Sequence, residues 1–164
     1  MIISQAPWWK GSRGEWFVFA QLALFGLVFF GPPTWFGWPT WIFPYTRLGS
    51  ISSGVLVLMG ILLIVTGICK LGGNLTAVPY PKEQSTLVEK GPYQLVRHPM
   101  YSGAILVAFG WAFWVGGWFT IGYAIILFVF FDVKARREEQ WLKEKFSGYF
   151  AYQERVRKLI PFVY

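Results

Sequence analysis

The hydrophobic residues of this chain gather into four uninterrupted apolar stretches, at residues 16–30, 51–69, 100–115 and 118–131. None of the four contains Asp, Glu, Lys or Arg. A helix needs about 20 residues to cross about 30 Å of hydrocarbon, and only the second stretch approaches this length. The others need flanking aromatic residues, or must dip into the bilayer and return. The pattern predicts an all-α integral membrane protein with about four transmembrane helices, the last two forming a tight hairpin at Gly116 and Gly117.

A different pattern follows the fourth stretch, where apolar residues recur every three or four positions between charged ones. They are Trp141, Leu142, Phe146, Tyr149, Tyr152 and Val156. This period is typical of an amphipathic helix, so we expect a C-terminal cytoplasmic helix over residues 132–157, interrupted near Ser147 and Gly148 and stopped by Pro161. Such a helix can lie on the membrane surface with its Lys and Arg toward anionic lipid.

The basic residues are distributed unevenly around the apolar stretches. Fourteen of the fifteen Lys and Arg lie before the first stretch, between the second and third, or after the fourth, which leaves Arg47 alone on the other side. Lys and Arg accumulate in the cytoplasmic loops of membrane proteins. We therefore expect both termini and the loop at residues 87–98 in the cytoplasm. The compact size of the chain favours a bacterial inner membrane.

Two segments have alternative interpretations. Residues 32–44 place Trp35, Trp38 and Trp41 among prolines, which suits an interfacial aromatic belt, with a substrate platform as the alternative. The first apolar stretch is short and preceded by basic residues, as in a signal peptide, but no small-x-small cleavage site follows it. We expect it to remain as a membrane helix.

Composition supports a membrane protein and excludes several classes of function. Hydrophobic residues make up 55% of the chain and charged residues 14%, against about 25% charged in ordinary soluble domains. Cys69 is the only cysteine and His98 the only histidine, which excludes an intramolecular disulfide and a Cys/His metal cluster. The net charge is +7, but no nucleic-acid-binding motif accompanies it, so anionic lipid headgroups are the expected partner.

The densest group of reactive side chains lies just before the third apolar stretch. Arg97 and His98 are adjacent there, and such groups are costly near lipid unless a polar or anionic partner meets them. Glu138 and Glu139 follow the fourth stretch at a similar expected depth. With the nearby tyrosines they predict a pocket for a zwitterionic ligand, in which arginine pairs with a carboxylate and glutamate with an ammonium or sulfonium. S-adenosylmethionine carries all three groups.

Two motifs carry a resemblance to a known family. They comprise Gly91-Pro92-Tyr93, Val96-Arg97-His98-Pro99, Tyr101 and Gly103, and then, beyond the hairpin, Glu138, Glu139, Leu142, Phe146, Tyr149, Tyr152, Val156, Ile160 and Pro161. From about Gly73 onward the chain resembles the isoprenylcysteine carboxyl methyltransferase family. Phospholipid N-methyltransferases share the Arg-His-Pro and Glu-Glu features, so the resemblance identifies the superfamily better than the substrate.

The resemblance implies a single membrane methyltransferase domain over residues 1–164, with the first two spans in 1–72 and the cofactor-binding catalytic half in 73–164. Such an enzyme takes S-adenosylmethionine from the cytosol and a lipophilic substrate from the bilayer, in this family the carboxylate of an isoprenylcysteine. The reaction would depend on Arg97, Glu138 and Arg136, with the arginines holding an anionic group of the cofactor or the substrate. The cofactor would be bound by Tyr93, His98, Pro99, Tyr101, Gly103, Glu138, Glu139 and Tyr152.

Simpler roles are open to three of these residues. His98 can cap the following helix, Glu139 can pair with Lys143 one turn later, and Arg97 can extend to lipid headgroups. Two other functions also remain open at this point. One is methyl transfer to a phospholipid amine, and the other is a non-catalytic membrane protein that binds lipid.

Overall fold

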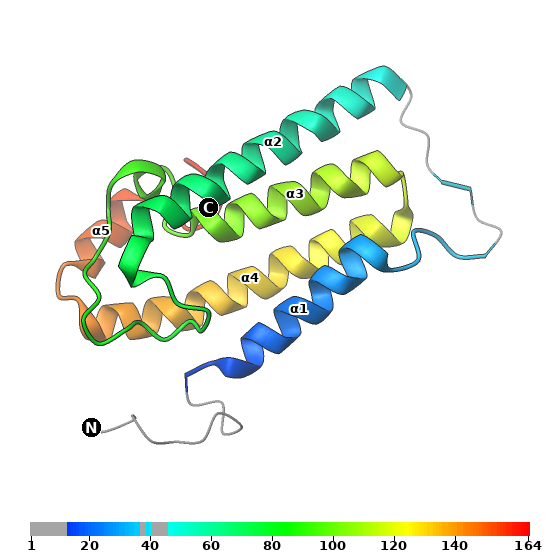
Figure 1. Cartoon of the computed structure of the whole chain (residues 1–164). Coiled ribbons are helices and arrows are strands. Elements are labelled where there is room, and N and C mark those ends of the chain that lie inside the picture. The colour runs from blue at the N-terminus through cyan, green and yellow to red at the C-terminus, as the bar shows by residue number, and fades with distance from the viewer. Residues whose placement is uncertain (1–12, 37–38, 41–45) are drawn as a thin grey trace.

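The computed structural model describes residues 13–36, 39–40 and 46–164. These residues form an elongated bundle of four long helices (Figure 1), which are α1 (Glu15–Phe30), α2 (Thr46–Leu71), α3 (Pro99–Val115) and α4 (Trp118–Lys145). One end of the bundle carries the shorter elements, which are η2 (Gly72–Asn74), η3 (Gly91–Gln94) and α5 (Tyr149–Arg155). The described ranges contain no β-strand, so the all-α prediction is confirmed for this part of the chain.

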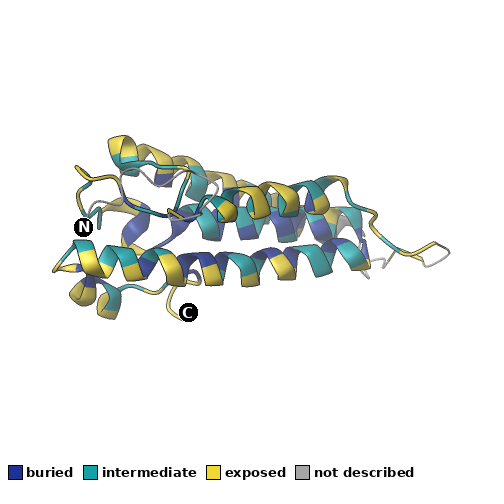
Figure 2. Cartoon of the chain, turned by 90° about the horizontal axis from the view of Figure 1, so that it is seen from below, coloured by how far each residue is buried: buried dark blue, intermediate teal, exposed yellow. Residues whose placement is uncertain are grey.

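Many residues on the outer faces of the bundle are exposed (Figure 2), and a large share of them are apolar. Among the described residues, α2 and α4 are long and apolar enough to cross a membrane. Only 17% of the most apolar 18-residue segment of α2, and 33% of that of α4, is buried inside the protein. A core helix of a soluble protein would be largely buried. Exposed residues such as Leu62 and Ile126 therefore favour a lipid environment. α1 and α3, with 16 and 17 residues, are shorter than a full crossing requires.

The predicted hairpin between α3 and α4 is confirmed. Gly116 has φ 66°, a left-handed conformation that glycine adopts without the usual penalty, and its N–H donates to the carbonyl of Ala112. This geometry ends α3. Gly117 follows in an extended conformation, and α4 begins at Trp118.

α4 extends beyond the apolar stretch that predicted it. The helix continues past Phe131 to Lys145 and is about 42 Å long at 1.5 Å per residue. No Gly or Pro lies between these two residues to end it. The expected separate helix from residue 132 is therefore wrong, because this segment is the continuation of α4. The predicted interruption near Ser147 and Gly148 is present, and α5 follows it.

The interior of the bundle lies between α1, α3 and α4. Its buried residues are Val28, Ile105, Ala108, Ala112, Ala124, Leu127, Phe131 and Leu159. α2 packs along a different side of α3 (Figure 1), and small residues allow the two helices to approach closely.

Gly103, which the motif included among the cofactor-binding residues, lies at this contact between α2 and α3. A Cβ atom on Gly103 would lie 2.5 Å from the carbonyl oxygen of Gly60 and 2.7 Å from Cγ1 of Ile64. The first of these neighbours is backbone and cannot rotate away. Gly103 therefore serves the packing of the two helices on which the site is built.

Replacing Gly103 by Ala should destabilise the protein by about 1–3 kcal/mol, because the backbones of α2 and α3 must separate to admit the methyl group. The measurement is thermal unfolding in detergent. Gly122→Ala is the matched control, since a Cβ there meets nothing within 4 Å, and it should leave the midpoint unchanged or slightly raised. An unchanged midpoint for Gly103→Ala, together with lost cofactor binding, would contradict the packing role.

The tryptophan-rich segment between α1 and α2 is described only in part. Trp35 is exposed, and its ring lies 6.2 Å from that of Phe119 at the start of α4. Trp38 and Trp41 lie outside the described residues. The aromatic belt stays a prediction.

Candidate active site

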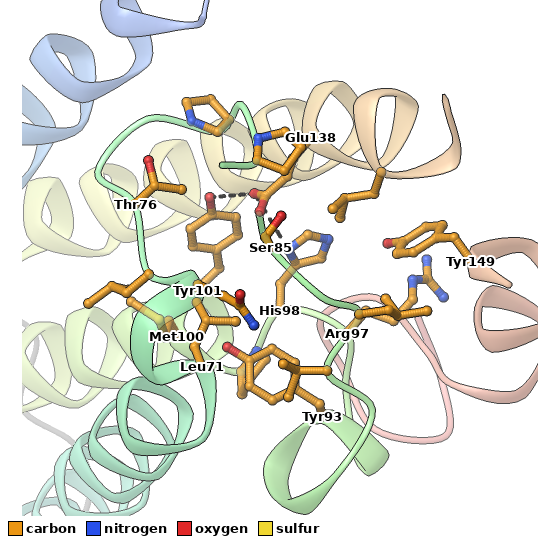
Figure 3. A pocket seen from close by; sticks show the side chains of 18 of the residues that line it. Leu71, Thr76, Ser85, Tyr93, Arg97, His98, Met100, Tyr101, Glu138 and Tyr149 are labelled. Atoms are coloured by element: carbon orange, nitrogen blue, oxygen red, sulfur yellow. Dashed lines mark hydrogen bonds and ion pairs between the residues drawn. The ribbon is translucent and has the colours of Figure 1, made fainter. Parts of the chain in front are cut away.

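A cavity of about 370 Å³ lies at the end of the bundle where α3 begins and α4 ends (Figure 3). Its volume is within the range of small-molecule sites. Residues 75–88 cover part of it, and α1, α2, α3 and α4 also contribute to its walls. The predicted site residues that line it are Tyr93, Arg97, His98, Pro99, Tyr101, Glu138 and Tyr152.

His98 lies between the two glutamates of the second motif. Its Nε2 is 3.2 Å from Oε1 of Glu139, so this nitrogen carries the hydrogen that Glu139 accepts. Its Nδ1 is 3.8 Å from Oε2 of Glu138, which is too long for a hydrogen bond. Tyr101 donates to the same Glu138 oxygen at 2.7 Å and stacks on the His98 ring at a centroid distance of 5.2 Å. The fold therefore brings the two motifs together, as Figure 3 shows.

Arg97 and Glu139 form a buried ion pair behind His98. Arg97 Nε donates to Glu139 Oε1 at 2.8 Å, and the two side chains are 7% and 6% exposed. Arg97 Nη1 also donates to the carbonyls of Gln153 and Val156. The Gln153 side chain donates to the second Glu139 oxygen at 3.2 Å. Glu139 supports the site from behind and is absent from the cavity lining.

These contacts decide among the simpler roles considered for three residues. Arg97 is buried in protein and does not extend to the membrane surface. Glu139 pairs with Arg97 and His98 rather than with Lys143. His98 occupies the N-cap position of α3, but its side chain makes no capping hydrogen bond.

The tail after α5 holds the Arg97–His98 segment in position. The backbone N–H groups of Arg97 and His98 donate to the carbonyls of Arg157 and Lys158 at 2.8 and 3.2 Å. These bonds are of the kind that pairs neighbouring strands. The segment before α3 is thus fixed by main-chain contacts as well as by side chains.

Tyrosines from α5 complete another wall of the cavity. Tyr152 donates to the carbonyl of Tyr93 at 2.6 Å. Burial, with a contribution from the charge of Glu138, raises the pKa of Tyr93 to about 12. Burial also raises the pKa of Tyr149 well above its usual value, and the charge of Glu139 adds to this effect. All three hydroxyls therefore stay protonated at neutral pH.

Tyr149 differs from the other two because its hydroxyl is unpaired. The residue is 1% exposed, and its Oη has no hydrogen-bond partner in the described part of the chain. In Figure 3 this hydroxyl points toward the middle of the site. A buried hydroxyl left without a partner costs about 1–3 kcal/mol. An acceptor atom on a ligand would remove this cost.

Arg136 lies outside the cavity. Its side chain is 63% exposed and pairs with Oδ2 of Asp132 at 2.7 Å. It also donates to the hydroxyl of Tyr164 at 2.9 Å. Arg136 is not among the residues that line the cavity, so its predicted role in holding an anionic group stays a prediction without support from this position.

The cover over the cavity is held by hydrogen bonds to Asn74 and Lys145 and by Tyr80, whose ring lies 5.5 Å from that of Trp141 on α4. The side chain of Asn74 accepts from the N–H of Thr86 and donates to its carbonyl, both at 3.2 Å. Lys145, the last residue of α4, donates to the carbonyl of Glu83 at 2.9 Å and to Oγ of Ser85 at 3.0 Å. Residues 75–88 are thereby tied to η2, which follows α2, and to the end of α4.

Sequence reasoning overlooked Lys134 and Gln21, which also line the cavity. Lys134 precedes Glu138 by four positions, so the two share a face of α4. That spacing is a signal from which Lys134 could have been predicted. Gln21 is the one strongly polar side chain in the first apolar stretch, and polar residues within such stretches mark sites.

Comparison with known proteins agrees with these motifs. The family model described as phospholipid methyltransferase matches residues 48–148. The chain is 31% identical over 112 residues to protein-S-isoprenylcysteine O-methyltransferase B of Arabidopsis thaliana, covering 66% of this chain and 57% of that protein. It is 28% identical over 113 residues to a probable protein-S-isoprenylcysteine O-methyltransferase of Oryza sativa subsp. indica, covering 66% and 59%.

The chain thus spans less than two thirds of the length of the curated relatives it matches. The family model covers more than half of the chain, from the start of α2 to the turn before α5. The resemblance to isoprenylcysteine carboxyl methyltransferases predicted from the motifs is confirmed, and the chain belongs to the phospholipid methyltransferase family.

Proposed function

We propose that this protein is an integral-membrane methyltransferase that uses S-adenosylmethionine to methylate a lipophilic substrate, with the carboxylate of an isoprenylcysteine as the favoured acceptor. The observation that carries the proposal is the position of Glu138. Its Oε2 accepts from Tyr101, its Oε1 has no hydrogen-bond partner among the described residues, and the residue lines the cavity. A fixed carboxylate with a free oxygen suits the ammonium or sulfonium of the cofactor.

The remaining lining fits the same cofactor. The unpaired hydroxyl of Tyr149 can donate to an acceptor on the ligand, and Met100, Leu142 and Phe146 offer apolar surface to the adenosine. His98, Pro99, Tyr93 and Tyr152 complete the proposed contacts. Arg97 and Glu139 act as positioning residues behind His98. Arg136 and Gly103 lie away from the cavity and take no part in these contacts.

When bound, S-adenosylmethionine would supply an electrophilic methyl group to the acceptor oxygen, with the electron pair of the broken S–C bond left on sulfur. A carboxylate acceptor is ionised at pH 7 and needs no base. The protein's contribution is therefore position. Holding the two reactants in near-attack geometry can supply about 7–11 kcal/mol of the barrier, and the stack of His98 on Tyr101 keeps that wall rigid.

We further propose a four-span topology in a bacterial inner membrane, with both termini and the cavity on the cytoplasmic side. The uneven distribution of Lys and Arg supports this orientation. α1 and α3 would complete their crossings with flanking aromatic residues. The cofactor would then reach the cavity from water, and the acceptor would arrive from the bilayer.

Methyl transfer to a phospholipid amine is the second candidate, because the matched family model is named for phospholipid methyltransferases. Purified protein supplied with methyl-labelled S-adenosylmethionine, an N-acetylated S-farnesylcysteine and phosphatidylethanolamine separates the two. We expect label in a base-labile methyl ester. Label in a methylated headgroup would support the second candidate, and no transfer to either acceptor would contradict both.

Tyr149→Phe provides a separate test of cofactor binding. Loss of an unpaired hydroxyl should leave the stability of the ligand-free protein equal or higher. Affinity for S-adenosylhomocysteine should fall about twofold to tenfold, equivalent to one hydrogen bond of about 0.5–1.5 kcal/mol. Titration calorimetry and thermal unfolding measure both quantities.

Tyr152→Phe is the matched control for this test. Its hydroxyl already donates to the carbonyl of Tyr93, so the ligand-free variant should lose stability. Unchanged affinity for S-adenosylhomocysteine in Tyr149→Phe would show that Tyr149 does not contact the cofactor.

A further inference from the structure

Lys134 is a buried ammonium group at the cavity wall that no carboxylate of the described residues contacts directly. The residue is 3% exposed and lies on α4, one turn before Glu138. Its Nζ donates to Oε1 of Gln21 at 2.6 Å and lies 5.0 Å from the centroid of the Tyr101 ring. Within the described ranges, no Asp or Glu oxygen lies within 4.0 Å of this nitrogen. Lys134 therefore has a neutral amide and an aromatic face as its direct contacts, and the charge of Glu138, one helical turn away, acts on it without touching it.

This arrangement leaves donors available for a ligand. An ammonium carries three N–H donors, and Gln21 accepts one of them. The amide nitrogen of Gln21 carries two more donors, and both residues line the cavity. A buried charge without a counter-ion in direct contact is costly. An anionic group in the cavity would meet donors from two helices and neutralise Lys134.

The two arginines that the motif suggested for binding an anion are already neutralised. Arg97 pairs with Glu139 and also donates to backbone carbonyls. Arg136 pairs with Asp132 on the outer face of α4. The role of holding an anion, which the motif suggested for these two arginines, is better suited to Lys134.

The position of Lys134 relative to Glu138 indicates which anion would bind. Four residues along a helix correspond to about 6 Å. The Lys134 ammonium therefore lies about one turn from the Glu138 carboxylate on the same wall, and one oxygen of that carboxylate accepts from Tyr101. A methyl donor that carries a positive charge suits the Glu138 end. A carboxylate acceptor suits the Lys134 end, whereas an amine acceptor would meet a positive charge there.

We propose that Lys134 and Gln21 bind the carboxylate of the lipophilic acceptor and thereby select acidic over amine substrates. This inference rests on the proposed methyltransferase function and adds to it the two residues that would bind the acceptor's carboxylate and select it over an amine. Gln21 lies in α1, whose outer residues face the apolar surroundings. The acceptor's chain would therefore extend along α1 toward the bilayer.

The test measures equilibrium binding to the full-length protein in nanodiscs without cofactor. The probes are N-acetylated S-farnesylcysteine and its C-terminal amide, which differ in one charge. We expect the wild-type protein to bind the carboxylate at least tenfold more tightly than the amide. Lys134→Met should lower the carboxylate affinity at least tenfold, leave the amide unchanged, and change the affinity for S-adenosylhomocysteine less than twofold.

Two further variants keep the test decisive. Lys143→Met removes an exposed lysine from the same helix and should change none of the affinities. Gln21→Glu places a carboxylate beside Lys134 and should preserve folding. Because this new carboxylate would itself pair with Lys134, the variant should lose the preference for the carboxylate probe. This variant covers the case in which Lys134→Met does not fold.

Three results would overturn the inference. They are a wild-type protein without preference for the carboxylate, an unchanged preference in the folded variants, and loss of S-adenosylhomocysteine binding with the carboxylate preference intact. The last result would make Lys134 a ligand of the cofactor. Failure of the proposed function looks different: the preference and its dependence on Lys134 would remain, but no methyl group would be transferred.

Discussion

Replacing Arg97 by Leu should destabilise the protein by about 3–5 kcal/mol, because it leaves the Glu139 carboxylate buried without its cation. Among the Lys and Arg side chains of the described residues, the Arg97 guanidinium alone contacts Glu139. The substitution also removes donors from the carbonyls of Gln153 and Val156. Chemical unfolding in detergent measures the effect, and S-adenosylhomocysteine binding should be lost with it.

The double variant Arg97→Leu/Glu139→Leu is the control for this mechanism. Removing both charges eliminates the unpaired carboxylate, so the double variant should be more stable than Arg97→Leu alone. Such recovery marks a charge-pairing effect in a double-mutant cycle. Additive losses from the two substitutions would contradict it and would indicate that the residues stabilise the fold independently.

Glu138→Gln should lower the affinity for S-adenosylhomocysteine at least tenfold, while the stability of the ligand-free protein stays nearly constant. The amide oxygen of Gln can still accept the hydrogen bond from Tyr101, so the wall of the cavity is preserved. The charge that would attract the cofactor's ammonium is lost, and a hydrogen bond to a charged group contributes about 1.5–3 kcal/mol. Titration calorimetry and methyl-transfer rates measure the consequence.

Glu144→Gln is the matched control on the same helix, because Glu144 is exposed and lies away from the main cavity. It should bind S-adenosylhomocysteine as the wild-type protein does. Normal affinity in Glu138→Gln would remove the main support for the proposed cofactor site. Reduced affinity in both variants would point to a long-range effect of net charge instead.

The helices were predictable from the sequence because apolar stretches without charges have few other stable forms in a membrane. The end of α4 was not predictable in this way. The first charged residue, Asp132, marks the end of the apolar stretch, but it does not interrupt the hydrogen bonding of the helix. That helix continues to Lys145 because nothing in its sequence breaks it. The hairpin was predicted because two adjacent glycines between apolar stretches offer an inexpensive turn.

The site was predictable to the level of motifs but not of individual side chains. Arg97, His98 and Glu138 converge as expected. Lys134 and Arg136 are two positions apart, about 200° around a helix, so one is buried at the cavity and the other is exposed. A count of basic residues along the sequence does not distinguish Lys134 from Arg136. The unpaired hydroxyl of Tyr149 depends on how the chain folds back after Gly148, which local sequence does not specify.

The cover formed by residues 75–88 has a consequence for the surrounding bilayer. Its fastenings at Asn74 and Lys145 are mostly exposed hydrogen bonds, each with a net contribution of about 0.5–1.5 kcal/mol. Opening this segment costs little compared with separating the helices. A water-soluble ligand can then exchange while α1 to α4 stay in place, so lipids packed around these helices need not rearrange when that ligand enters or leaves.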